Sequence, residues 1–218
     1  MSPLVRLRKL LGHLRRQFGL DTYDVFVRPV PADADFAPPA GYAFRFGTAA
    51  DVERCDPLHT ELDERERREG VVRLGLGHRV VLGLHQETIV FTMWVNPRCL
   101  NVPGLLKRAL SPRQWFIYKA YTSPEHRGRK LYEGGMRFVL AEMRRGDLTE
   151  LVGYAHVNKA VSRKGLAALA FGSAGTVRQL RLLGWRATRL SPALRRRFPR
   201  EVTRSGAVAA ETGRLRSA

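Results

Sequence analysis

The chain has 218 residues, 44% of them hydrophobic and 27% charged, so it can bury a sizeable core and is neither disordered nor of low complexity. No stretch approaches the roughly 18 uninterrupted apolar residues of a membrane-spanning helix. The net charge of +18 is unusual, because residues 1–20 carry five basic side chains and no acid, and residues 186–218 carry nine arginines against two glutamates. Basic ends on a mildly basic centre indicate appendages that touch an anionic surface, either a membrane or nucleic acid.

Residues 1–20 predict a basic amphipathic helix. Apolar side chains at positions 4, 7, 11, 14 and 18 form one helical stripe, and the basic side chains lie off it. Such a helix docks on its own domain, packs on a partner helix or lies in an anionic membrane interface. Arginines interrupt the segment throughout, unlike a signal peptide, and the two cysteines make no disulfide framework. We therefore expect a cytoplasmic protein, peripheral to the inner face of the membrane if this helix binds lipid.

The rest of the chain predicts an α/β fold with an antiparallel front half. Residues 21–41 predict a strand followed by a Pro-rich connector, residues 42–185 the folded body, and residues 186–218 a basic, flexible tail. Within the body the patterns predict, in order, β-α-α-β-β-β-α-β-α-β over residues 42–46, 48–55, 61–69, 79–84, 88–95, 115–121, 131–146, 151–157, 160–169 and 176–183.

One junction between a predicted strand and a predicted helix carries a candidate binding site, where residues 122–132 read TSPEHRGRKLY. A basic, Gly-containing turn at a helix start presents free backbone N–H groups and the positive end of the helix dipole, which suits a phosphate or pyrophosphate. Arg127, Arg129 and Lys130 add positive charge, and Gly128 lets the backbone approach a ligand closely. On these residues alone, an ordinary solvated basic turn is the alternative.

Together with the strand–Asn–helix segment HVNKAVSRKGLAALAF at 156–171, this layout resembles the GNAT superfamily of acyl-CoA-dependent N-acyltransferases over residues 42–185. The resemblance implies a mixed, mostly antiparallel central sheet flanked by helices. It also implies acetyl-CoA or a longer acyl-CoA as co-substrate, no metal, and a loop whose main-chain amides cradle the CoA pyrophosphate. The residues that it assigns to the cofactor are Thr122, Arg127, Gly128, Arg129, Lys130, Leu131, Tyr132, Asn158 and Ser162.

The chain departs from the family pattern in several places. Lys130 and Tyr132 stand where the family has Gly and then Gly or Ala, and Ala170 replaces the Gly of the family's Gly-Phe pair. The Asn and Ser of the second segment are four residues apart rather than three. Leu166 lies near the position where many members carry a tyrosine that protonates the leaving thiolate, so this role is unassigned.

A looser resemblance involves the segment Val27-Arg28-Pro29, which follows the basic N-terminus. A similar arrangement precedes the acyltransferase body in bacterial GNAT-like proteins linked to the assembly of surface polysaccharides. The acceptor implied is a small-molecule primary amine, such as an amino sugar or another metabolite near the membrane of a bacterial cell.

The expected chemistry is direct attack of the acceptor amine on the thioester, whose carbonyl is polarised in the family by a backbone N–H of the strand at 115–121. Glu87, Tyr118 and His156 are candidate proton acceptors, and a water-relayed base is the alternative. Trp94, Tyr118 and Tyr154 are candidates for an acceptor pocket, with core packing as the alternative.

Two other functions remain open. The basic ends fit a nucleic-acid-associated protein, and the departures fit a degenerate module that binds acyl-CoA without turnover. The sequence contains no Gly-Lys-Ser/Thr phosphate loop, no Gly-x-Ser-x-Gly elbow and no clustered metal ligands, which argues against a nucleotidase or a hydrolase. The oligomeric state is not indicated.

Overall fold

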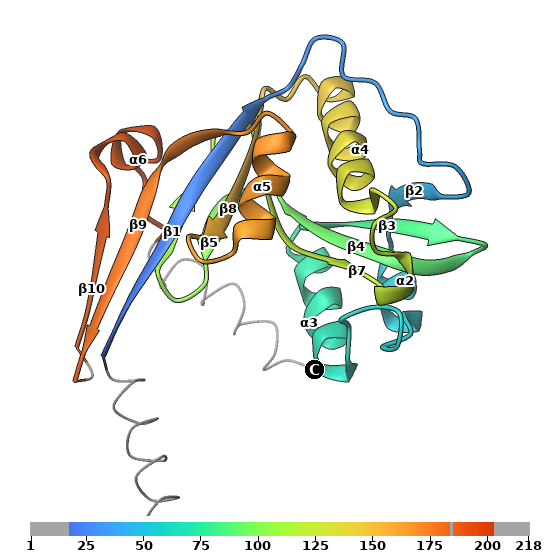
Figure 1. The fold of residues 1–218 in the computed structure, drawn as a ribbon, viewed down its shortest axis with the longest axis horizontal. Helices are drawn as coiled ribbons and strands as arrows, with labels where there is room; N and C mark the ends of the chain where they lie inside the picture. The colour runs from blue at the N-terminus through green and yellow to red at the C-terminus, as the bar shows by residue number, and fades with distance from the viewer. Residues whose placement is uncertain (1–17, 184, 203–218) are drawn as a thin grey trace, which may run out of the picture.

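An eight-stranded sheet forms the centre of the computed structural model, which describes residues 18–183 and 185–202 (Figure 1). Its central strands are rich in Val, Ile, Phe, Tyr and Trp, which favour a pleated, half-buried backbone. In spatial order the strands are β10 (Trp185–Leu190), β9 (Gly172–Leu182), β1 (Phe18–Pro29), β8 (Glu150–His156), β7 (Gln114–Thr122), β4 (Thr88–Asn96), β3 (Arg79–His85) and β2 (Ala43–Phe46). Neighbours are antiparallel except for β7 and β8, so the predicted mixed sheet is confirmed.

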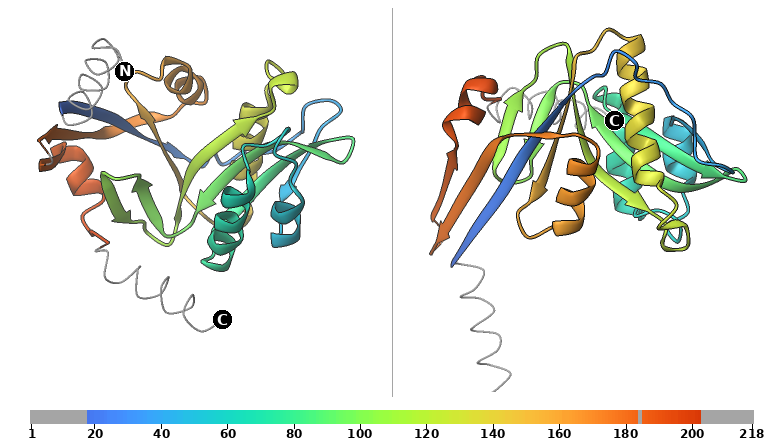
Figure 2. Two further views of the ribbon diagram at one scale, coloured as in Figure 1. Left: turned by 90° about the horizontal axis from the view of Figure 1, so that it is seen from below. Right: turned by 45° about the horizontal axis from the view of Figure 1, so that its top comes forward.

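Helices and a hairpin cover the two faces of this sheet (Figure 2). One face carries α4 (Leu131–Arg145) and α5 (Ala160–Ala168). The other carries α2 (Ala49–Arg54), α3 (Glu64–Gly75), the hairpin of β5 (Cys99–Val102) and β6 (Leu106–Ala109), and α6 (Pro192–Arg197). Among the described residues, no helix combines the length and the apolar character that crossing a membrane requires.

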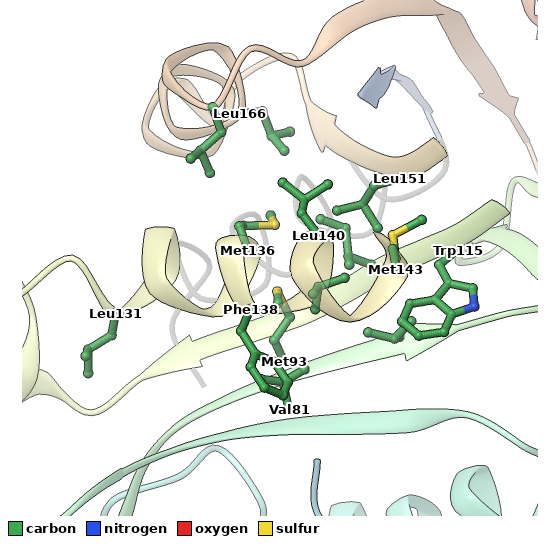
Figure 3. Packing of buried hydrophobic residues seen from close by; sticks show 14 of the residues in the cluster. Val81, Met93, Trp115, Leu131, Met136, Phe138, Leu140, Met143, Leu151 and Leu166 are labelled. Carbon is green, nitrogen blue, oxygen red and sulfur yellow. The ribbon is translucent and has the colours of Figure 1, made fainter. Parts of the chain in front are cut away.

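The largest core cluster lies around α4. Figure 3 shows Met136 and Leu140 on the side of this helix that faces Leu166, and Phe138 on the side that faces Met93. The helix approaches the sheet closely, because its first turn contains glycines. A Cβ at Gly135 would lie 2.5 Å from a ring carbon of a β4 phenylalanine. This packing fixes where α4 begins, and therefore where the loop before it lies.

The structure corrects the predicted ends of the folded body. Most of the predicted N-terminal helix lies outside the described residues, and residues 18–20 are the start of β1 rather than the end of a helix. The strand predicted at 21–30 is confirmed, but it lies in the middle of the sheet, where Val25 and Val27 are buried. Residues 186–202 were expected in a flexible tail, but they form most of β10 and all of α6. Leu194 of α6 packs in the core cluster that contains Val25 and Val27, which holds this segment on the sheet. The β5–β6 hairpin was not predicted.

Candidate active site

The ladder between β7 and β8 ends early and leaves a cavity. These parallel strands pair only from Gln114 and Glu150 to Phe116 and Val152. Beyond these pairs they diverge, and a cavity of about 880 Å³ lies between them. Side chains from β1, β4, β7, β8, α4 and the α5 region line it. The gap therefore lies in the middle of the sheet, between two strands that would otherwise be hydrogen-bonded.

Residues that face opposite sides of the sheet line the cavity, because successive side chains of a strand point to opposite faces. Ile117 of β7 lines the cavity and packs in the core cluster that contains α4 and α5. The next residue, Tyr118, and Tyr154 of β8 also line it, but they pack against the cluster on the opposite face. The cavity therefore has lining residues from the α4/α5 side and from the opposite side of the sheet.

A β-bulge in β7 lies beside the cavity. The ladder with β4 shifts register between Thr92 and Trp94, so that Met93 lies opposite both Lys119 and Ala120. Lys119 has a φ of 47°, in the left-handed region, and both bulge residues line the cavity. The extra residue of a bulge is left out of the ladder, so a backbone amide at this point is available to a ligand.

The loop before α4 has the geometry of an anion site. Gly128 has a φ of 77° and Lys130 a φ of 60°, and no side chain caps the start of the helix. The first backbone N–H groups of a helix have no partner within it, so those of α4 are free to bind a ligand. Arg127 is held by its Nε, which donates to the carbonyl of Thr122 at 3.3 Å. A Cβ at Gly128 would meet nothing within 4 Å, so this glycine is required for its backbone angle and not for space.

Tyr132 connects this loop to the cavity. It lines the cavity, and its Cε1 lies 3.4 Å from where a Cβ of Gly165 on α5 would be. Burial raises the pKa of the Tyr132 phenol. Of the other predicted cofactor residues, Asn158 and Ser162 line the cavity, and both are exposed at the start of α5. Thr122 and residues 127–131 lie just outside it, and Leu131 is buried, so that only its backbone is available.

A carboxylate lies on the opposite face of the cavity. Asp21 of β1 lies 3.8 Å from Nε2 of His156 and 3.0 Å from Nη2 of Arg181. Nδ1 of His156 accepts the backbone N–H of Asn158 at 3.1 Å, so in the neutral ring the hydrogen is on Nε2 and faces Asp21. His156, a predicted base, therefore lies beside Asp21 on this face of the cavity.

Tyr118 forms a second pair with His78. The Tyr118 hydroxyl and Nδ1 of His78 are 2.5 Å apart. Burial raises the pKa of Tyr118, and burial together with nearby cations lowers the pKa of His78 to about 4. At neutral pH the phenol is protonated and the imidazole is neutral, so Tyr118 donates this hydrogen bond. Tyr118, predicted from the sequence, thus lines the cavity with its hydroxyl oriented by a residue that the sequence did not indicate.

Two predicted site residues lie away from the cavity. Glu87 is exposed in the β3–β4 turn, beside Arg45 and Asp51. Trp94 is buried on the α2/α3 face, where the guanidinium of Arg73 lies 5.3 Å from its ring centre. Trp94 therefore follows the alternative given for it, which is core packing.

Several lining or supporting residues were missed by sequence reasoning. Asp21 and Tyr23 are two residues apart on β1 and point to one face of the sheet. Their spacing is visible in the sequence, but this strand was expected to precede the folded body, so its residues were not predicted as part of the site. His78 and Arg181 showed no local signal. Within the described ranges, no group of three or more His, Cys, Asp or Glu side chains is arranged to hold a metal ion.

A scan of family models and a search of curated proteins found no match to this sequence. Solved structures match its fold. A protein assigned to the GNAT acetyltransferases from Novosphingobium aromaticivorans matches with a TM-score of 0.52 at 17% identity, over 74% of this chain and 64% of its own. A conserved protein of unknown function from Staphylococcus epidermidis matches with a TM-score of 0.51 at 9% identity, over 83% and 67%. A GCN5-related N-acetyltransferase from Sphaerobacter thermophilus gives 0.49 at 14% identity, over 84% and 58%.

The chain therefore shares the fold of the GNAT-family protein from Novosphingobium aromaticivorans, as the sequence predicted. It covers between 58% and 67% of the length of these three proteins.

Proposed function

We propose that the protein is an N-acyltransferase that moves an acyl group from acetyl-CoA or a longer acyl-CoA to a primary amine. The observation that carries this proposal is the cavity that crosses the sheet between β7 and β8. Direct transfer requires the thioester and the amine to be held against each other in one site. A cavity with an uncapped helix start near one side and a carboxylate on the other meets this requirement.

The acyl-CoA belongs on the α4/α5 side. The free amides at the start of α4 suit the pyrophosphate, and Arg127, Arg129 and Lys130 supply exposed positive charge next to them. The bound thioester supplies the acyl group. The free amide of the bulge at Lys119 and Ala120 is placed to donate a hydrogen bond to the thioester carbonyl, where negative charge develops during attack.

The acceptor belongs on the opposite side, where Asp21 binds its ammonium group and accepts one proton from it. Arg181 and His156 hold this carboxylate in place. The rings of Tyr118 and Tyr154 line this side and both stack on Phe116, and the ring of Tyr23 is tilted beside Tyr154. These aromatic rings suit the body of an amino sugar. The free amine then forms a bond to the acyl carbon as the carbon–sulfur bond breaks. The second proton that its nitrogen loses replaces the one that Tyr132 gives to the thiolate.

Tyr132 is placed to protonate the departing thiolate. Leu166 on α5, near the position where many GNAT members carry a tyrosine, is buried. Tyr132 reaches the neighbouring residue of the same helix, Gly165, from α4. The raised pKa of its phenol keeps the proton on it at neutral pH until the thiolate forms.

The test for cofactor binding is the CoA-induced rise in melting temperature of the full chain. Gly128→Val forces a branched residue to adopt a φ of 77° and should abolish the rise. Gly104→Val is the matched control, because Gly104 has a φ of 73°, nothing near its Cβ, and lies in the β5–β6 turn. It should carry the same strain and keep the CoA effect. An undiminished CoA effect in Gly128→Val contradicts the loop assignment.

Turnover is tested by release of free thiol from acyl-CoA with a panel of amines. Asp21→Asn and Tyr132→Phe should each lower the rate by about a hundredfold or more while the CoA effect persists. A CoA effect without thiol release from any amine would make the chain an acyl-CoA-binding module. Salt-sensitive binding to DNA or RNA without a CoA effect would favour the nucleic-acid alternative.

An anionic membrane partner is part of this proposal, as is a cytoplasmic location at the inner membrane face. It rests on the five basic side chains and the apolar stripe in the sequence of residues 1–20. The same sequence also fits the docking of this segment on the protein's own surface.

A further inference from the structure

Five large apolar side chains are exposed together where β1 begins and where β9 turns into β10. Leu20, Leu180, Leu182, Leu183 and Trp185 are between 43% and 67% exposed. In Figure 1 these strand ends lie at the lower left, beyond α5. We call these five residues the open apolar face. Contiguous exposed apolar surface on a folded protein usually marks a contact site.

The strand register shows that four of these residues share one face of the sheet. Leu20 lies opposite Leu180, and Leu182 lies opposite Trp185, and directly opposite residues point to the same side. Leu180 and Leu182 are two residues apart on β9 and therefore also share a face. Leu183 follows in the turn.

The other face of β9 is covered. Gln179 is buried, and its side-chain amide donates to the carbonyl of Gly104 in the β5–β6 turn at 3.0 Å. Val177 is buried against α6. The same strand thus has one packed face and one exposed apolar face, a pattern typical of a surface that is covered by something outside the fold.

The charge around the open apolar face is positive. Arg178 and Arg189 lie opposite each other, on the same side of the sheet as Leu180. Both are exposed, and within residues 18–183 and 185–202 neither makes an ion pair. The segment that enters β1, residues 1–17, has five basic side chains and no acid in its sequence. The surroundings therefore favour an anionic partner.

We infer that the open apolar face docks on an anionic lipid bilayer. Trp185 and the leucines enter the boundary between headgroups and acyl chains, where tryptophan is enriched, and Arg178 and Arg189 contact lipid phosphates. Cover by residues 1–17 would bring five more cations against these arginines. A second copy of the chain would bring its own charge of +18 against these arginines. The five side chains are also far fewer than the roughly 20–30 residues that each partner contributes to a stable protein interface. The inference stands apart from the proposed acyl transfer.

The chain offers a direct readout, because Trp185 is the exposed member of its three tryptophans, and Trp94 and Trp115 are buried. Adding vesicles rich in phosphatidylserine to the full chain should shift its tryptophan emission to shorter wavelength, and lipids brominated on their acyl chains should quench it. Trp185→Phe should remove both effects without weakening co-sedimentation strongly. Emission that phosphatidylserine vesicles leave unchanged overturns the inference.

Charge insertions then locate the surface. Leu180→Glu/Trp185→Glu should weaken co-sedimentation with phosphatidylserine vesicles by about tenfold or more. Val72→Glu/Leu58→Glu is the matched control, because these apolar residues are 45% and 80% exposed in the α2–α3 region, and it should bind like the wild type. Equal binding by both double variants overturns the inference.

Neutralising arginines tests the electrostatic part. Arg178→Gln/Arg189→Gln should weaken binding and its salt dependence, whereas Arg65→Gln/Arg68→Gln on the exposed side of α3 should not. Leu7→Glu/Leu11→Glu measures the contribution of the N-terminal segment to vesicle binding. If this double variant abolishes vesicle binding and the tryptophan shift while the variants of the sheet face do not, the sheet face is not the docking surface. A dimer in light scattering that Trp185→Glu dissociates would assign the face to a second copy instead.

Discussion

Acid should destabilise this fold through His78. Burial, with further contributions from the nearby cations Arg73, Arg98 and Lys107, lowers the pKa of His78 from 6.5 to about 4. Its Nδ1 accepts the hydroxyl of Tyr118. Protonation of the ring therefore removes a hydrogen-bond acceptor from a buried phenol and adds a positive charge beside three others.

The size of the effect follows from linkage between folding and proton binding. Between pH 6.5 and about 4 the unfolded chain binds a proton at His78 that the folded chain does not, so stability falls as the pH falls through this window. Above pH 6.5 this residue contributes no pH dependence. At pH 4.5 the two pKa values correspond to about 2.5 kcal/mol, which partial exposure of the ring reduces to roughly 1–2 kcal/mol.

The assay is urea unfolding of the wild type and His78→Asn at pH 7.5 and pH 4.5. Asparagine keeps an acceptor near the position of Nδ1 but does not titrate, so the carboxylates contribute equally in both proteins. The wild type should lose roughly 1–2 kcal/mol more than the variant between these pH values. An equal loss would show that His78 is not held neutral and would refute the reasoning.

Three further predictions concern packing, capping and the cavity. Gly135→Ala should lower the free energy of unfolding by about 1–3 kcal/mol, because its Cβ would lie 2.5 Å from a phenylalanine ring. Gly75→Ala, with nothing within 4 Å of its Cβ, should raise it by up to about 1 kcal/mol; similar values from urea unfolding would contradict this packing. Thr48→Ala should cost about 1 kcal/mol, because Thr48 forms the capping box of α2, and Thr48→Ser should restore most of the loss in thermal unfolding. Gly153→Leu places its side chain in the cavity, where a Cβ alone would make ordinary contacts at 3.5 Å. Thiol release from a long acyl-CoA should therefore fall more than thiol release from acetyl-CoA. Equal losses for the two substrates would argue against passage of the acyl chain at this point.

Local patterns were sufficient for most elements and for one wall of the candidate site. Apart from the β5–β6 hairpin, the order of helices and strands between residues 42 and 183 follows from apolar periodicity. The loop before α4 was recognised because its glycine and basic residues are adjacent in the chain. The fold resemblance rests on this loop and on the segment at 156–171, and a solved structure confirms the fold. Capping by Thr48 is also local, since its partner is three residues away.

On the acceptor side, Tyr118, Tyr154 and His156 were predicted, but their partners were beyond the reach of such patterns. Asp21 and His156 are brought together by the pairing of β1 with β8, and His78 and Tyr118 by a side-chain contact between a loop and β7. No spacing in the sequence encodes either pair. Glu87 was wrongly grouped with them because a polar residue in a turn has the same pattern whether it faces a cavity or solvent.

The sequence by itself determined most of the helices and strands, the basic character of the ends and the basic, Gly-containing loop before α4, because each depends on residues within a few positions of one another. Only the tertiary structure decided that β1 lies in the middle of the sheet, and that β7 and β8 diverge to leave a cavity. It also decided which face of β9 is exposed. Alternation assigns Val177 and Leu180 to opposite faces, but the positions of the β5–β6 hairpin and α6 determine which of them is buried. These features depend on which distant segments pack together, and the packing that forms is the one with the lowest free energy for the whole core.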